Sequence, residues 1–165
     1  MKNQKGFSLI ELLIVVVIIG IIAAIAIPNL LASRRAANEG SAISAMRTLH
    51  GAQMTYASTY GGGNYAGATT LDTTGLAALA STNLVDSVLG SGTKSGFNFQ
   101  GMKIDKTTTT PAQFMWSSVP STTSGVTATG ARRFGIATEG VIMSDTTLTD
   151  YADIAAVQAG TPLGN

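Results

Sequence analysis

The chain has 165 residues, enough for one modest domain in addition to a long helix. Only 12% of its residues are Asp, Glu, Lys or Arg, about half the usual share, and the formal net charge is +1. The sequence has no excess of Lys and Arg that would bind the phosphates of a nucleic acid, so we do not expect nucleic acid as the main partner.

The residue types that most enzymes and metal sites need are scarce. The chain has no cysteine, and His50 is its only histidine. The usual nucleophile, base and zinc-ligand sets therefore cannot be assembled. We expect a protein that is not an enzyme and carries no cofactor. Because it can form no disulfide, its folded part must be held by packing and hydrogen bonds.

The first element along the chain is an apolar run from Phe7 to Ile27 that contains one charged residue, Glu11. At the centre of a membrane helix, Glu11 costs about 3 kcal/mol, whereas each Leu, Ile, Val or Phe returns about 0.3–0.6 kcal/mol. Fifteen such residues lie in the run, so the segment still inserts. An ionisable group kept in a membrane segment indicates a functional site with a charged partner.

A cut between Gly6 and Phe7 would supply that partner. The new α-amino group would lie four residues before Glu11, and positions four apart share a helix face. A buried ammonium and a buried carboxylate relieve each other's cost, within one chain or between neighbouring subunits. Lys2 and Lys5 precede the run, which predicts a cytoplasmic N-terminus and an exported remainder.

The helical pattern continues beyond Pro28 to about Tyr60. A helix from Phe7 to Tyr60 would extend roughly 80 Å, and a bilayer core needs only about 30 Å, so its second half (29–60) stands outside the membrane.

Gly20 weakens the first half of this helix and Pro28 predicts a kink. Gly61–Gly63 is expected to end the helix. The inward face of the second half is expected to comprise Leu31, Ile43, Met46, Leu49, Gln53, Tyr56 and Tyr60.

Charged residues follow at the expected membrane exit. Arg34 and Arg35 come first, and Glu39 follows four residues after Arg35. We expect these side chains to be solvated and to pair locally; a contact between subunits is the alternative.

The rest of the chain is predicted to form a connecting region (61–96) followed by an antiparallel sheet with a C-terminal tail (97–165). Short helices are expected near 74–80 and 84–89 in the connecting region. Apolar alternation then predicts four strands, with Glu139 and Gly140 turning the last hairpin. The strands are expected at 97–104, 113–119, 132–138 and 141–144.

The fold class is therefore α+β. The sheet is expected to cover the exposed half of the long helix. The expected organisation is a segment 1–6, an apolar helix 7–28 and an exported head 29–165. The tail of the head is expected to lie along the edge of the sheet.

Three aspartates of the tail, Asp145, Asp150 and Asp153, are weak candidates for calcium ligands. Their spacing matches no calcium-loop template, so we expect no metal site.

The N-terminal residues as a set resemble the N-terminus of a type IV prepilin. The resemblance covers residues 1–60 in detail and the remainder only in general layout. It is carried by Lys5-Gly6-Phe7-Ser8-Leu9-Ile10-Glu11-Leu12-Leu13-Ile14-Val15-Val16, by Gly20 and by Ala26-Ile27-Pro28.

The resemblance implies a structural subunit of a type IV pilus, a homo-oligomeric helical filament. Prepilin peptidase would cut after Gly6 and methylate the Phe7 amine, which leaves residues 1–6 as a leader peptide. The precursor would lie in the inner membrane, engage an inner-membrane assembly platform and end in an extracellular filament. In the filament, Glu11 would meet a neighbour's Phe7 amine and set the register, and the stretch from Gly20 to Pro28 could unwind.

Other interpretations stay open. A major pseudopilin of type II secretion, the related group, is the main alternative; Thr73–Leu79 faintly resembles that group, whose members often hold calcium in C-terminal loops. A monomeric membrane-anchored binding domain is another. A secretory signal peptide with Ala24-Ile25-Ala26 as its cleavage site, or a plain single-pass anchor, would leave Glu11 unexplained.

Overall fold

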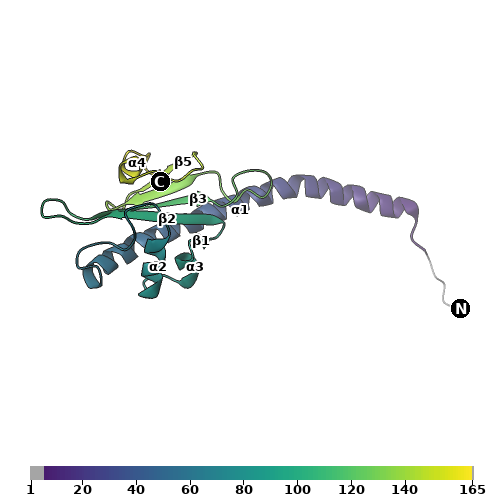
Figure 1. Ribbon diagram of the computed structural model, residues 1–165. Coiled ribbons are helices and arrows are strands. Elements are labelled where there is room, and N and C mark those ends of the chain that lie inside the picture. The colour runs from purple at the N-terminus through teal and green to yellow at the C-terminus, as the bar shows by residue number, and fades with distance from the viewer. Residues whose placement is uncertain (1–5, 165) are drawn as a thin grey trace. The chain divides into compact units, whose positions relative to one another are not determined.

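The computed structural model describes residues 6–164, so all of the expected leader 1–6 except Gly6 lies outside the described residues. By its internal contacts the chain divides between Arg34 and Arg35 into two compact units, here called the N-terminal unit and the head unit. The fold is α+β, as the sequence predicts, with a long helix followed by an antiparallel sheet (Figure 1).

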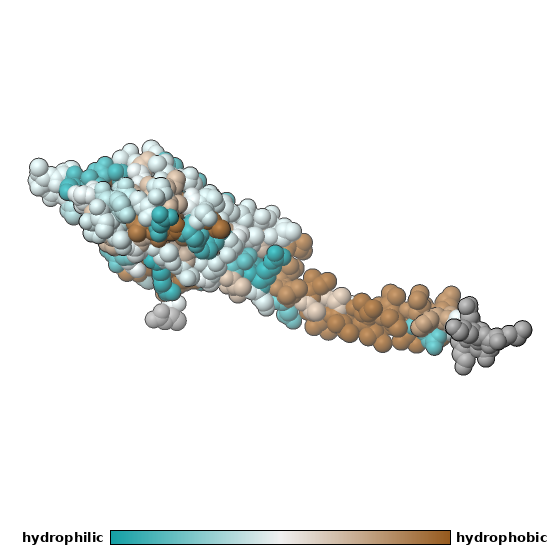
Figure 2. Space-filling model, turned by 90° about the horizontal axis from the view of Figure 1, so that it is seen from below, coloured by the Kyte–Doolittle hydropathy of each residue, from teal (hydrophilic) through white to brown (hydrophobic). Residues whose placement is uncertain are grey.

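The long helix α1 spans Leu9–Thr59 without interruption, through both Gly20 and Pro28. Within the N-terminal unit its large apolar side chains are exposed except that of Leu31, which is half-buried, and Figure 2 shows this stretch as a brown surface. The helix ends at the predicted glycines: the Gly61 N–H donates to the Tyr56 carbonyl (2.8 Å), and Gly62 and Gly63 have positive φ.

In the head unit the inner face of α1 is buried or half-buried where the spacing predicts, except at Tyr60. Ala42, Met46 and Leu49 are fully packed, whereas Tyr60 is 61% exposed because it lies beyond the last helical turn. Gln53 is buried because its amide exchanges two 2.8 Å hydrogen bonds with the backbone of Ala66, which fixes the chain after the helix.

The sheet has five strands in the order β1-β2-β3-β4-β5, all antiparallel. Four strands match the predicted ones. The fifth, β1, pairs with β2 through a two-residue turn, Ser95-Gly96, in which both residues have positive φ. Two residues are too few to show an alternating pattern, so β1 was missed. The strands are β1 (Thr93–Lys94), β2 (Phe97–Ile104), β3 (Gln113–Pro120), β4 (Arg133–Ala137) and β5 (Ile142–Asp145).

One face of the sheet packs on α1, as expected, and forms the main core. Trp116 of β3 lies against Gly101, where a Cβ would come within 2.2 Å of the indole ring. Glycine at this position is therefore a requirement of the packing. The other rings of this core are Phe97, Phe99, Phe114 and Phe134.

The opposite face of the sheet is also covered, which the sequence analysis did not foresee. The tail forms a short helix, α4 (Ile154–Gln158), that packs on β3 and β4 (Figure 1). Beyond α4 the chain runs along the edge of β5, where the Ser144 N–H donates to the Thr161 carbonyl (2.9 Å). The expectation that the tail follows the sheet edge is confirmed. This second core holds Met115, Ala137, Tyr151, Ile154 and Val157.

The connecting region contains both expected helices, α2 (Thr74–Ser81) and α3 (Ser87–Gly90). The second begins three residues later than predicted because Asp86 caps it. The Asp86 side chain accepts from the Leu89 N–H at 2.7 Å, which fixes the first turn after Asp86.

Glu39 does not pair locally with Arg35, contrary to the expectation from their spacing. It is 8% exposed, and its carboxylate accepts from Nε and Nη2 of Arg132 (3.0 and 2.9 Å) and from the Ala131 N–H (2.8 Å). Arg35 instead donates to the carbonyls of Gly125 and Ala128. These contacts tie the β3–β4 loop to α1.

Candidate processing and assembly site

Gly6, Phe7 and Ser8 precede the helix, lie outside any helix or strand and are exposed. Phe7 is 88% exposed. The Gly6–Phe7 peptide bond therefore lies outside regular structure, where a peptidase can bind the chain in an extended form.

Glu11 lies in the first turn of α1 and closes a capping box. Its Oε2 accepts from the Ser8 N–H at 2.8 Å, and the Ser8 hydroxyl accepts from the Ile10 N–H at 3.4 Å. The negative charge also faces the positive end of the helix dipole. In the uncut chain Phe7 lies before the helix begins, so Phe7 and Glu11 do not share a helix face.

Sequence reasoning missed the role of Ser8. The signal was present, because Ser8 and Glu11 have the spacing of a capping box directly before an apolar run. The pairing of Glu11 with a cleaved Phe7 amine remains a prediction.

Gly20 and Pro28 both lie within continuous helix. No atom lies within 4 Å of where a Cβ on Gly20 would stand, so no packing inside the chain requires a glycine there. Pro28 removes one helical hydrogen bond, and the Asn29 side chain donates back to the Ile25 carbonyl (3.3 Å). The kink and the unwinding remain predictions.

By length and composition α1 could cross a membrane, and no other helix in the described residues could. Its large apolar side chains from Leu9 to Leu30 are exposed. An exposed stretch of this size needs lipid or other protein surface to cover it.

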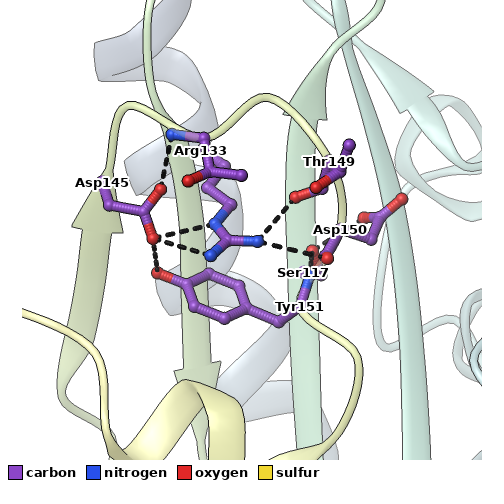
Figure 3. A network of polar contacts seen from close by, with 7 residues as sticks. Ser117, Arg133, Asp145, Thr149, Asp150 and Tyr151 are labelled. Atoms are coloured by element: carbon purple, nitrogen blue, oxygen red, sulfur yellow. Dashed lines mark hydrogen bonds and ion pairs between the residues drawn. The ribbon is translucent and has the colours of Figure 1, made fainter.

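The three tail aspartates do not converge on one point. Asp145 pairs with Arg133, which stands directly opposite it in the β4–β5 register, at 2.8 and 2.9 Å (Figure 3). Asp150 accepts from the Ser117 hydroxyl at 2.7 Å, and Asp153 caps α4. In residues 6–164 no group of three His, Cys, Asp or Glu side chains is placed to hold a metal ion.

Arg133 is the centre of this network. Its Nη1 donates to the carbonyls of Thr149 (2.8 Å) and Asp150 (3.2 Å), and its guanidinium lies 3.8 Å from the centre of the Tyr151 ring. Desolvation is the largest influence on Asp145 and raises its pKa, but hydrogen bonds from Arg133 and Thr147 outweigh it, so the pKa is lowered overall.

Comparison with known proteins identifies the N-terminal segment. The family model described as "Prokaryotic N-terminal methylation motif" matches residues 1–27. The chain has a prepilin-type N-terminus. The resemblance to type IV pilins and the related pseudopilins is thereby confirmed for this region.

Curated relatives agree with this assignment. The type IV wide pilus major component PilA4 of Thermus thermophilus is 67% identical over 39 residues, 24% of this chain and 30% of the relative. The type IV major pilin protein PilA of Myxococcus xanthus is 46% identical over 54 residues, 33% of this chain and 24% of the relative. Type II secretion system core protein G of Klebsiella pneumoniae is 36% identical over 52 residues, 32% of this chain and 37% of the relative.

The chain therefore spans about a quarter to two fifths of the length of these relatives. No solved structure matches it.

Proposed function

We propose that the chain is a structural subunit of a type IV pilus filament and has no enzymatic role. The observation that carries the proposal is the methylation motif over residues 1–27 at the start of an apolar helix whose large side chains from Leu9 to Leu30 are exposed. The relatives that are named pilus components support it.

The proposed pathway starts with a precursor in the inner membrane. Prepilin peptidase cuts after Gly6 and methylates the Phe7 amine, which keeps its positive charge. The exposure of the Gly6–Phe7 bond, outside any helix or strand, supports this step. An inner-membrane assembly platform then moves the helix from lipid into a protein bundle, and the filament leaves the cell.

In assembly, Glu11 pairs with the Phe7 amine of a neighbouring subunit and sets the register. An unpaired buried charge costs about 3–5 kcal/mol, so a subunit out of register is disfavoured. Glu11→Ala is expected to leave membrane insertion intact and to suppress filament growth.

A second variant separates this role from helix capping. Glu11→Gln keeps an acceptor for the Ser8 N–H, because glutamine also serves in capping boxes, but it loses the charge. If Glu11 acts through its charge, Gln and Ala variants both lose filaments. Normal filaments from Glu11→Gln would refute the charge pairing.

The experiment that tests the function is intact mass and N-terminal sequencing of protein from sheared extracellular material. A chain that begins at methylated Phe7 in that fraction is expected. An uncut Met1 terminus, with the peptidase present and active, would overturn the proposal.

A major pseudopilin of a type II secretion system is the second candidate. The match to core protein G favours it. A processed chain found only in the membrane, with no extracellular filament, is the result that this candidate predicts.

A further inference from the structure

Two segments of the head unit, on opposite sides of the sheet, carry opposite net charges. On one side of the sheet, residues 35–59 of α1 contain two arginines and one carboxylate, Glu39, which is buried against Arg132. On the other side, the segment 139–164 contains four acidic residues and no Lys or Arg.

Arg47 is the exposed cation of the helix side. None of the ion pairs among residues 6–164 includes it. Gly40 and Gly51 lie on the same side of α1, seven residues before and four residues after Arg47, and no atom lies within 4 Å of where their Cβ atoms would stand. This side of the helix is therefore open to close approach by another surface.

The tail side offers the complementary charge. Arg133 neutralises Asp145, but Glu139, Asp150 and Asp153 have no ion pair in the described residues. The same side also has apolar area to bury, in a pocket of about 260 Å³ lined by Ala137, Glu139, Val141, Met143, Val157 and Gln158.

We propose that the Arg47 side of α1 in one copy docks on the acidic tail side of the next copy. The inference rests on the proposed function as a filament subunit. Two different surfaces meet in such a contact, so it repeats from copy to copy and builds an open helical assembly. The complementary charges orient the copies, and a rotated copy would place like charges together.

Charge reversal tests this contact without disturbing the head. Arg47→Glu reverses the exposed cation. Asp150→Asn and Asp153→Asn, combined with Glu139→Lys and with Ala155→Lys on the exposed side of α4, change the net charge of the segment 139–164 from −4 to +1 while keeping the Ser117 acceptor and the helix cap. The control is Lys106→Glu, the same charge change on the β2–β3 loop outside both surfaces, which also removes the hydrogen bond from Lys106 Nζ to the Gly62 carbonyl.

The readout is the amount of processed subunit in sheared filaments relative to the membrane. Each reversal alone is expected to lower the filament fraction about tenfold or more, and the two reversals together to restore most of it, because opposite charges face each other again. The control is expected to match the wild type.

Normal filaments from either single reversal, or no recovery in the combination, would overturn the docking contact. If the wild-type chain itself forms no filaments, the proposed function fails instead, so the two failures are distinguishable.

Discussion

The contact between Glu39 and Arg132 allows the most direct test of how the head is held to the helix. Glu39→Ala removes the acceptor of three hydrogen bonds, one from the Ala131 N–H and two from Arg132. The Ala131 N–H would then lack its partner, and the guanidinium would lose its carboxylate.

The expected cost follows from burial. Breaking a buried ion pair costs about 3–5 kcal/mol, but the Arg132 side chain is 41% exposed, so water compensates part of its loss. We expect Glu39→Ala to lower the free energy of unfolding by about 2–3 kcal/mol. Glu39→Gln keeps an acceptor for the Ala131 N–H and should cost only about 1 kcal/mol.

The assay is denaturant unfolding of the full chain in detergent, followed by near-ultraviolet circular dichroism of Trp116, the only tryptophan. Arg132→Ala and the double variant complete a mutant cycle. A coupling energy below about 0.5 kcal/mol, or equal costs for the Ala and Gln variants of Glu39, would refute the reasoning.

Three further predictions follow from the head unit. Gly101→Ala should lower the unfolding free energy by about 1–3 kcal/mol because Trp116 must move, whereas Gly51→Ala, with open space at its Cβ, should raise it by about 0.5–1 kcal/mol; the same unfolding assay measures both. Because the folded pKa of Asp145 is lowered, its contribution to stability is present above the ordinary aspartate pKa of 3.8 and is lost as pH falls below that value through the folded pKa. Asp145→Asn should flatten this acid-side loss in melts recorded between about pH 5 and 2. Calcium and chelator should leave the melting temperature unchanged, since the three tail aspartates are engaged by Arg133, Ser117 and the cap of α4; a rise of several degrees with calcium would contradict this and favour the pseudopilin candidate.

Elements with a repeating pattern could be predicted from the sequence. The buried face of α1 follows the three- and four-residue spacing of Met46, Leu49 and Gln53, and four strands follow apolar alternation. The helix ends where three glycines permit it. Each of these signals lies within the element that it describes.

The rest depends on contacts between distant residues. Glu39 and Arg132 are 93 positions apart, so spacing within the helix suggested the wrong partner for Glu39. The second core could not be predicted, because Tyr151 and Val157 become buried only when α4 folds back on β3 and β4. At the N-terminus, the spacing of Ser8 and Glu11 was sufficient to predict the capping box. The sequence analysis instead considered only a positively charged partner for Glu11.

The tail shows how a head unit without cysteine keeps its C-terminal segment in place. Arg133 supplies a fixed positive charge from within the sheet and binds a carboxylate and two backbone carbonyls of the segment 145–150. Packing of Tyr151 and Val157 and the pairing of the chain with β5 act on the same segment from other directions. Because these ties are spread over three kinds of contact, no one of them alone has to hold the segment. The backbone of the tail therefore stays ordered while Glu139, Asp150 and Asp153 keep charges that no ion pair in the described residues neutralises, as the proposed docking contact requires.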